Sequence, residues 1–436
     1  MTAQVPHILI VGGGYVGMYT AYGLRHAARR GKIRVTVVDP RSVMTYQPFL
    51  PEAAAGSVEP RHVVVPLRKV LKGCRVVTGR VTALDHARKV AMVKPEEGPD
   101  YELAYDQVVV AIGSISRTLP IPGLAEEGIG FKNVEEAIAL RNRVLDRLDV
   151  ASSQPDEKLR KAALTFVFVG GGYAGVEAFA ELEDMARYAT RYYDNIEPSD
   201  MRWVLVEASG RILPEVSEDL GRYTVKQLRD RGLDVKLETR LESCKDGHVV
   251  LSDGDEFDAD TIVWTAGVKA NPALAATDLP LDDKGRVLAH ADLRVVDRPG
   301  AWAAGDDAAV PDMTATEPGT LLTPSAQHAV RQARRLAKNI LLVVDGKEPK
   351  NYVHKHVGSV ASLGLHKGVA ELYGIKVKGV LAWFLHRTYH VSRVPTFNRK
   401  ARVVADWTLA LFFRREVVSL GSLQHPEDEF RRAAGA

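Results

Sequence analysis

The chain has 436 residues, 46% of them hydrophobic and 26% charged, which is the composition of a globular protein large enough for more than one domain. Its net charge of +3 is too small to indicate a nucleic-acid partner, and it contains no zinc finger, basic helix or aromatic RNA-binding motif. The cysteines, Cys74 and Cys244, stand apart and outside any CxxC pair, so we expect reduced thiols, no redox dithiol and no metal site.

Two features bear on where the protein works. An apolar run begins within a few residues of the first methionine and leaves no room for a signal peptide, so we expect the protein to stay in the cytoplasm. The longest nearly apolar stretch, 403–413, contains Asp406 and is far shorter than the ~18 apolar residues of a membrane span.

The first predicted element is a buried strand that runs into a glycine-rich turn. Residues 8–17 read ILIVGGGYVG and place glycines in GxGxxG spacing at Gly12, Gly14 and Gly17. In a dinucleotide-binding unit, these glycines permit a tight turn, close approach of a pyrophosphate and close helix packing, respectively. A helix over 18–30 and a strand over 33–38 follow, and the strand ends in Asp39, which can hold a ribose diol. One such motif alone also occurs in purely structural turns.

The next segment, 44–56, is too rich in proline to continue a helix or a strand, and we expect a loop. Strands return near 75–81, 89–93 and 107–111. Residues 108–114 read VVVAIGS, a buried strand that enters a glycine turn and is expected to close the first domain over its ligand. A polar segment with a proline, 152–158, is predicted to be the linker to a second domain.

The second domain repeats the first motif. Residues 166–175 read FVFVGGGYAG, with glycines at Gly170, Gly172 and Gly175. A helix over 176–188 and a strand near 203–206 follow, and the strand ends in Glu207. A glutamate there would repel a 2′-phosphate and therefore favours NAD(H), although the nearby Arg211 could overturn this preference.

Two later segments repeat the pattern of a strand followed by a glycine turn. Residues 262–268 read IVWTAGV, and residues 301–310 read AWAAGDDAAV. The second of these is either a simple turn or a return of the chain to the first domain. The economical prediction is an α/β fold of two Rossmann-like domains, with the NAD domain (160–275) inserted in the FAD domain (1–125 and 285–350), and a C-terminal amphipathic, membrane-associating region (351–436).

These motifs, in this order, resemble those of the flavoproteins with two dinucleotide-binding domains. Within that group the chain is most similar to the type II NADH dehydrogenases, single-subunit enzymes of the membrane surface that pass electrons from NADH through FAD to quinone without pumping protons. The loop YQPFLPEAAAG, the helix TPSAQHAVRQARRLAKNI and the end of the chain resemble that family's flavin loop, quinone-site helix and membrane anchor. The resemblance covers nearly the whole chain.

The resemblance implies individual site residues. FAD would contact Gly12, Gly14, Gly17, Asp39, Pro48, Val81, Gly113 and Asp306. NADH would contact Gly170, Gly172, Gly175, Glu207 and Gly267. Glu177 matches a glutamate near the nicotinamide and flavin rings and would orient the nicotinamide, because hydride transfer depends chiefly on positioning. The alternative for Glu177 is an ordinary acid at a helix N-terminus.

The predicted quinone helix departs from the family pattern. The family has two glutamines four residues apart, whereas here Gln327 is followed by Arg331, and Gln332 points elsewhere on a helix. Gln327 is the second predicted catalytic residue. Arg331 could hydrogen-bond a quinone carbonyl or close the tunnel. The lack of paired cysteines argues against sulfide:quinone reductases and disulfide reductases.

The region 376–416 is strongly basic, and Val403, Val404, Trp407 and Leu411 fall on one face of a predicted helix. Cations beside an apolar stripe suit a helix lying on anionic lipid. The alternative is a helix packed on its own domain or on a second copy, which leaves a homodimer open.

The sequence therefore predicts a peripheral enzyme at the cytoplasmic face of the cell membrane, with FAD as cofactor, NAD(H) as substrate and menaquinone or ubiquinone as acceptor, and with no nucleic-acid partner. One alternative is a soluble NAD(P)H-dependent reductase with another acceptor. The other is a non-catalytic, NADH-sensing flavoprotein.

Overall fold

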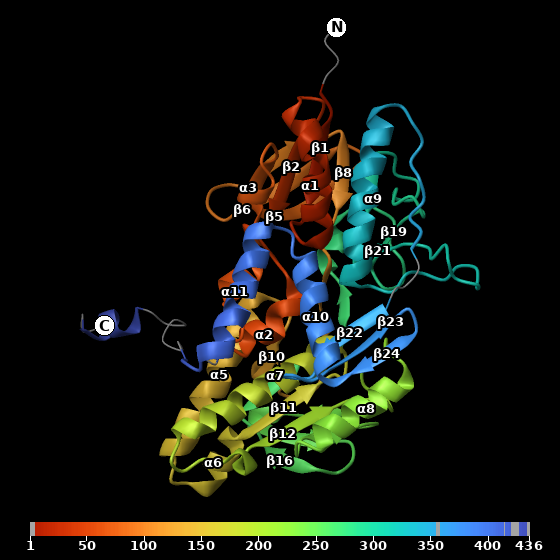
Figure 1. The fold of residues 1–436 in the computed structure, drawn as a ribbon. Helices are drawn as coiled ribbons and strands as arrows, with labels where there is room; N and C mark the ends of the chain where they lie inside the picture. Colours follow the sequence, from red (N-terminus) through yellow and green to blue (C-terminus); the bar gives the residue numbers. More distant parts are fainter. Residues whose placement is uncertain (1–4, 355–357, 414, 420–426, 434–436) are drawn as a thin grey trace. The chain divides into compact units, whose positions relative to one another are not determined.

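The computed structural model describes residues 5–354, 358–413, 415–419 and 427–433 (Figure 1). The chain forms two compact units. Unit 1 comprises Met1–Thr45, Val64–Ile115 and Val268–His356; unit 2 comprises Tyr46–Val63, Ser116–Gly267 and Val357–Ala436. The segment 116–267 of unit 2 thus lies in the sequence between two parts of unit 1, in keeping with the predicted insertion. The division differs from the predicted one, because 46–63 and 357–436 also belong to unit 2.

Unit 1 contains a seven-stranded sheet. Its strands, in spatial order, are β20 (Ala301–Ala303), β8 (Gln107–Val110), β1 (His7–Val11), β2 (Arg34–Asp39), β5 (Arg75–Asp85), β6 (Val90–Pro95) and β7 (Tyr101–Ala104). The first five run parallel, and β6 and β7 extend the sheet antiparallel. Strands β1, β8 and β20 are nearly continuous apolar runs, as expected for strands covered on both faces, whereas β5 contains several polar residues and is partly exposed. The pairing of β20 with β8 places the GDD turn beside the VVVAIGS turn in one sheet.

Two long helices of unit 1, α1 (Tyr15–Arg29) and α9 (Ala326–Val344), lie side by side (red and cyan in Figure 1). Small residues allow this close approach: a Cβ at Gly23 would lie 2.6 Å from Cβ of Ala337, and Thr20 donates a hydrogen bond to the Ala333 carbonyl. The shorter elements of the unit are β3 (Val43–Thr45), β4 (Val64–Pro66), α3 (Leu67–Val70), β18 (Val268–Ala270), η6 (Pro272–Ala276), β19 (Val287–Leu288) and β21 (Ala308–Ala309); β9 (Ser114–Ser116) runs across the boundary to unit 2.

Unit 2 contains a five-stranded parallel sheet in the order β10 (Gly128–Gly130), β17 (Thr261–Trp264), β11 (Thr165–Val169), β12 (Arg202–Val206) and β13 (Asp234–Lys236). An antiparallel sheet of β14 (Leu241–Ser243), β15 (His248–Leu251) and β16 (Glu256–Asp258) accompanies it. The helices are α4 (Leu124–Glu127), α5 (Val134–Ser153), α6 (Glu157–Ala163), α7 (Tyr173–Ala189) and α8 (Glu218–Arg229), with the 3-10 turns η3 (Thr190–Tyr192), η4 (Pro198–Asp200) and η5 (Lys245–Gly247).

Two sequence predictions in this unit are wrong. The segment 44–56 is not a loop throughout: η1 (Gln47–Phe49) and α2 (Leu50–Ala54) form in it, followed by η2 (Pro60–His62). Pro51 stands in the first turn of α2, where a backbone N–H would have no hydrogen-bond partner within the helix, so a proline is tolerated there. The polar segment 152–158 ends α5 and begins α6 inside unit 2, so it is no linker between units.

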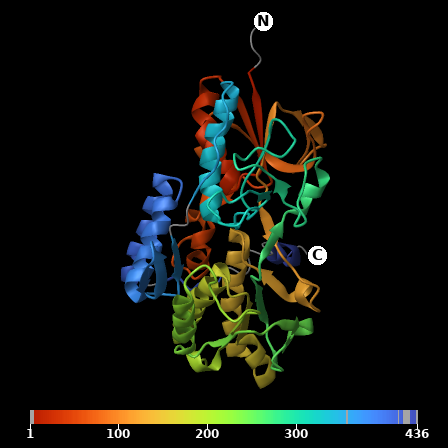
Figure 2. The same cartoon turned by 90° about the vertical axis from the view of Figure 1, so that its right-hand side faces the viewer.

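The C-terminal part of unit 2 forms a three-stranded sheet and three helices (blue in Figure 2). The sheet consists of β22 (Gly358–Ser362), β23 (Gly368–Leu372) and β24 (Ile375–Lys378), and the helices are α10 (Gly379–Arg393), α11 (Phe397–Phe413) and α12 (Asp428–Ala433). Helix α10 packs on the sheet. Among the residues that the structure describes, no helix combines the length and the apolar character needed to cross a bilayer.

Candidate functional site

The glycine turn of unit 1 is shaped by the protein's own packing at two of its three positions. Gly12 has a φ of +104°, and a Cβ there would lie 2.2 Å from the Ala111 carbonyl oxygen. A Cβ at Gly17 would lie 1.8 Å from the Gly12 carbonyl oxygen. A Cβ at Gly14 would meet no atom within 4 Å. The middle glycine is therefore not required by the fold, and its open space is what the close approach of a ligand backbone or phosphate needs.

Asp39, at the end of β2, lies against this turn. Its Oδ2 accepts a hydrogen bond from the Gly13 N–H at 2.6 Å, and its Oδ1 accepts one from the Arg41 N–H at 2.7 Å. Burial raises the pKa of Asp39, and the two backbone N–H groups offset part of that effect. The structure thus brings the predicted acid and the glycine turn together.

The turns that follow β8 and β20 also meet. The Gly113 N–H donates to Asp307 Oδ2 at 3.1 Å, and the Ser114 hydroxyl donates to Asp306 Oδ2 at 2.7 Å. Asp307 is fully buried, and this burial raises its pKa to about 8, with a further contribution from the charge of Asp306. Sequence reasoning singled out Gly113 and Asp306 and missed Asp307, whose only signal was the doubled aspartate.

Helix α9 supports the same turn through Gln332, which sequence reasoning set aside as pointing elsewhere. The side chain is buried, and its Oε1 accepts a hydrogen bond from the Gly305 N–H at 2.7 Å. Gln332 therefore holds the GDD turn in place and is not available on the face of Gln327 and Arg331.

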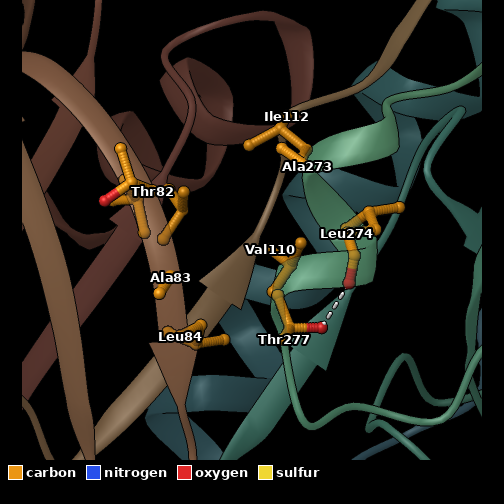
Figure 3. A pocket seen from close by; sticks show the side chains of 10 residues that line it. Thr82, Ala83, Leu84, Val110, Ile112, Ala273, Leu274 and Thr277 are labelled. Carbon is orange, nitrogen blue, oxygen red and sulfur yellow. Dashed lines mark hydrogen bonds between the residues drawn. The ribbon is translucent and has the colours of Figure 1, made fainter.

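A small apolar pocket lies at the carboxyl ends of the parallel strands of unit 1 (Figure 3). Its lining comprises Val11, Val81, Thr82, Ala83, Leu84, Val110, Ile112, Ala273, Leu274 and Thr277. The Thr277 hydroxyl donates to the Leu274 carbonyl at 2.7 Å, the bond that Figure 3 marks with a dashed line. This edge of an open α/β sheet is where ligands bind. Val81, predicted from the resemblance, is part of this lining, whereas Pro48 belongs to unit 2, where it lies half-buried in η1.

Unit 2 repeats the arrangement with different side chains. A Cβ at Gly175 would lie 2.0 Å from the Gly170 carbonyl oxygen, and one at Gly172 would meet no atom within 4 Å. Glu207 Oε2 accepts from the Gly171 N–H at 2.6 Å, and its Oε1 accepts from the Ser209 N–H at 2.7 Å.

Two further residues border this turn. The Arg211 guanidinium donates to the Val216 carbonyl in its own loop. Gly267 has a φ of +89°, a left-handed conformation that favours glycine, and its carbonyl accepts from the Arg117 N–H. The predicted nucleotide residues of unit 2 thus surround one turn, and Arg211 is engaged by its own backbone.

Glu177 lies on α7 and is almost fully buried. Its Oε1 accepts a hydrogen bond from the Ser362 N–H at 2.8 Å and lies 3.0 Å from His386 Nε2. Both contacts converge on one carboxylate oxygen of Glu177, and an exposed acid at a helix N-terminus would have neither. Sequence reasoning did not identify either partner.

Gln327 and Arg331 lie on α9 in unit 1, both partly exposed. Gln327 Oε1 lies 3.2 Å from His354 Nε2, and the Arg331 guanidinium donates to the Gln327 carbonyl at 3.1 Å. His328, the next residue on the helix, contacts the Tyr352 hydroxyl at 2.9 Å. The predicted quinone helix thus carries a cluster of polar and aromatic side chains, with the arginine folded back onto its own helix.

Both cysteines are free thiols. Cys74 belongs to unit 1 and Cys244 to unit 2. Burial raises the pKa of each thiol to about 11, so neither is a thiolate at neutral pH.

Comparisons with known proteins agree with this geometry. The family model "Pyridine nucleotide-disulphide oxidoreductase" matches residues 6–333. A type II NADH:quinone oxidoreductase of Mycobacterium tuberculosis is 27% identical over 434 residues, which covers 95% of this chain and 90% of that protein. A type II NADH:quinone oxidoreductase of Staphylococcus aureus is 29% identical over 394 residues, covering 89% and 94%.

Among solved structures, NDH2 of Plasmodium falciparum in complex with NADH matches with a TM-score of 0.88 at 18% sequence identity, over 95% of this chain and 100% of that one. These similarities confirm the resemblance that the sequence indicated. The chain belongs to the pyridine nucleotide-disulphide oxidoreductase family.

Proposed function

We propose that this protein is an FAD-dependent NADH:quinone oxidoreductase of the type II class. The observation that carries the proposal is the pair of glycine turns, each with an open middle position and each held by a carboxylate at the end of the next strand. One turn suits a resident dinucleotide and the other a dinucleotide substrate. The names of the relatives, which are NADH:quinone oxidoreductases, support the same choice of donor and acceptor.

The residues of unit 1 fit FAD. The open space at Gly14 would take the pyrophosphate at the N-terminus of α1, where unpaired N–H groups and the helix dipole favour an anion. Asp39 would hold the ribose, Gly113 and Asp306 would contact the ribityl or pyrophosphate portion, and the apolar lining near Val81 would shield the ligand. When bound, FAD supplies the two-electron carrier between nicotinamide and quinone.

The residues of unit 2 fit NADH. Gly172 leaves space for the pyrophosphate, and Glu207 would accept hydrogen bonds from the adenosine ribose and repel a 2′-phosphate. Since Arg211 is bound to the Val216 carbonyl, it does not counter this selectivity. Glu177, fixed by its partners, would orient the nicotinamide, and Gly267 would border the nucleotide.

Gln327 would donate a hydrogen bond to a quinone carbonyl, with Arg331 beside it on the same helix. The glutamine pair of the family is replaced here by glutamine and arginine, so the acceptor site would carry a positive charge. A guanidinium near a quinone oxygen favours the negative charge that develops as the quinone is reduced. Menaquinone and ubiquinone are both candidates.

Exposed apolar side chains on two helices support binding to the membrane surface. On α11, Leu411 and Phe412 are 73% and 76% exposed, and on α10, Leu381 and Phe384 are 60% and 56% exposed. Basic residues such as Arg402 accompany them, a combination that suits anionic lipid. We place the protein peripherally at the cytoplasmic face, where NADH is available; a homodimer through the same helices is an alternative use of this surface.

The test is anaerobic stopped-flow spectroscopy of the FAD-loaded protein. Fast loss of flavin absorbance with NADH, slower loss with NADPH, and fast recovery on adding a short-chain menaquinone or ubiquinone are expected. Recovery with a soluble dye but with neither quinone would indicate a reductase with another acceptor. Negligible bleaching by NADH would contradict the enzyme proposal and favour an NADH sensor.

A further inference from the structure

Glu177 belongs to a buried cluster of charged side chains in unit 2 that the sequence did not predict. The cluster joins four elements that are far apart in the chain: Glu52 on α2, Glu177 and Glu181 on α7, His386 and Arg387 on α10, and Arg415 after α11. Charged groups are seldom buried unless they are paired. Each member therefore requires an electrostatic explanation.

Glu52 is paired within the cluster through one of its two carboxylate oxygens. Its Oε2 accepts a hydrogen bond from Trp407 Nε1 at 2.6 Å and lies 3.2 Å from the Arg387 guanidinium. The Arg387 guanidinium also lies over the Trp383 ring, 4.1 Å from its centroid. One guanidinium and two indole rings thus neutralise and enclose this carboxylate.

Glu181 is less well compensated. Its Oε1 accepts from the Ser362 hydroxyl at 2.8 Å, and Arg415 lies 3.8 Å from its Oε2. Burial raises the pKa of Glu181, and the Arg415 charge offsets only part of this effect. The two guanidinium groups of the cluster are therefore committed to Glu52 and Glu181.

Glu177 is left with a histidine as its cationic partner. His386 is 1% exposed, and its Nε2 lies 3.0 Å from Glu177 Oε1. Burial lowers the pKa of His386, but the charges of Glu177, Glu52 and Glu181 outweigh burial and leave the pKa raised. A histidine in this position carries a proton at a pH where a solvent-exposed one does not.

The neighbouring histidine behaves in the opposite way. His390 lies one turn further along α10, with its ring centroid 4.5 Å from that of His386. Burial and the charge of His386 hold the pKa of His390 well below its usual range. Tyr46 contacts its ring nitrogen and its carbonyl. The pKa values of the two rings are therefore shifted in opposite directions, and the ring whose protonated form is favoured is the one beside Glu177.

We propose that His386 is the positioning residue of Glu177: its protonated ring and the Ser362 N–H together fix the Glu177 carboxylate in one orientation toward the nicotinamide. The inference rests on the proposed function for the role of Glu177, but the ion pair itself can be tested without turnover. When His386 loses its proton, Glu177 loses its cationic partner and keeps only the backbone contact. The orientation of NADH then weakens as the pH rises.

The sign of the pH effect follows from the raised pKa of His386. The ion pair contributes stability at low pH, where the histidine is protonated in both folded and unfolded protein, and this contribution is lost as the pH rises through the folded pKa. The groups that face His386 are Glu177 and Glu181 from α7, Glu52 from α2, and Arg387 and His390 from α10 itself. The charges of all three carboxylates raise the pKa of His386.

The experiment uses the full-length, FAD-loaded protein with three variants. His386→Gln removes the charge, His386→Lys keeps a cation to higher pH, and His390→Gln is the matched control on the same helix. The rate of flavin reduction by NADH at saturating and limiting NADH is followed from pH 6 to 9. We expect the wild-type rate to fall with one ionisation, His386→Gln to be about tenfold slower at low pH and nearly independent of pH, and His386→Lys to move the fall to higher pH.

A second measurement separates the ion pair from the activity. The ring of His386 is titrated by nuclear magnetic resonance in wild-type protein and in Glu177→Gln, with His386→Gln used to assign the signal. We expect a midpoint above that of an exposed histidine, and a lower midpoint in Glu177→Gln. If wild-type protein is not reduced by NADH at all, the proposed function fails while this titration still tests the pair.

Three outcomes would overturn the inference. His386 could titrate below the usual histidine range, His386→Gln could retain the wild-type pH profile, or His390→Gln could lose activity and pH dependence as fully as His386→Gln. Thermal unfolding of each variant is recorded alongside. A loss of rate in His386→Gln with an unchanged unfolding temperature supports positioning, and a loss that tracks unfolding in all three variants refutes it.

Discussion

The glycine turns of the two units have nearly identical sequences, yet different side chains complete them. In unit 1, Asp39 holds the glycine turn, and Asp306 and Asp307, which follow β20, contact the turn after the adjacent strand β8. In unit 2, Glu207 holds the turn, and the neighbouring strand β17 is followed by Thr265, whose hydroxyl donates to the Val169 carbonyl at 2.9 Å.

This difference shows that the GxGxxG motif determines the backbone conformation of each turn. The segments that follow the adjoining strands determine which side chains surround it. The first and third glycines of both units are fixed by contacts within the protein, and the middle ones are not. The ligand that each turn takes is therefore decided by residues outside the motif. The predictions below test this division, beginning with the largest expected effect.

The glycine positions provide the sharpest test. Gly17→Ala and Gly175→Ala each place a methyl group about 2 Å from a carbonyl oxygen and should destabilise their own unit by about 3 kcal/mol or more. Gly14→Ala and Gly172→Ala are the matched controls, because their Cβ atoms meet open space. The controls should unfold at the wild-type temperature without ligand but lose FAD or NADH binding, respectively. Equal unfolding temperatures for all four variants would contradict the distinction between glycines that the fold requires and glycines that only a ligand requires.

A surface prediction concerns unit 2. Changing Leu411 and Phe412 together to serine should weaken binding to vesicles of anionic lipid by about tenfold or more, because each side chain gives up apolar burial in the interface. Co-sedimentation with vesicles measures this. Leu159→Ser, which alters an exposed leucine on α6, is the control and should leave binding unchanged. Unchanged binding of the double variant would favour a protein interface at α11.

Nucleotide preference is the third test. Glu207→Gln keeps a hydrogen-bond acceptor for the Gly171 N–H but removes the charge, so the preference for NADH over NADPH should fall roughly tenfold, a change of about 1.4 kcal/mol. The ratio of kcat/KM values for the two nucleotides is the measurement. Glu238→Gln removes a nearby carboxylate that does not bind the turn and should have little effect. A preference retained in Glu207→Gln would place selectivity elsewhere.

The smallest effect is expected at Asp307. Because its pKa is raised to about 8 in the folded protein, its contribution to stability is present below about pH 4 and is lost as the pH rises toward 8. Asp307→Asn should remove this loss and raise the unfolding temperature at pH 8.5 by a few degrees, at roughly 2–4 °C per kcal/mol, with less effect at pH 5. Asp283→Asn, at an exposed site, is the control. A difference that is equal at both pH values would show that Asp307 is ionised throughout.

The C-terminal helix shows how a sequence pattern can be partly misread. Val403, Val404, Trp407 and Leu411 were predicted to share one face of α11 that lies either on lipid, on its own domain or on a second copy, but the face is divided: Val403 is fully buried and Trp407 binds Glu52. Val404 and Leu411 are exposed. Asp406, which seemed only to interrupt the apolar run, contacts His62 at 2.6 Å and so anchors the helix. Periodicity identified an amphipathic helix, but the partner of each side could not be inferred from periodicity.

The sequence by itself determined the two nucleotide-binding units, their order and the insertion of one within the other. It could do so because a buried strand, a GxGxxG turn and a strand-end acid are local features whose geometry follows from neighbours in the chain. The same locality explains why Asp39 and Glu207 were identified and why both lie against their glycine turns.

Only the tertiary structure decided which side chains meet across long sequence separations. Gln332 binding the Gly305 backbone, Asp307 buried beside Gly113, and His386 beside Glu177 all join elements far apart in the chain. No spacing rule predicts such contacts, because burial and charge pairing depend on the packing of whole elements. For that reason the sequence identified Glu177 as a residue of interest, and the fold supplied the buried histidine that lies 3.0 Å from its carboxylate.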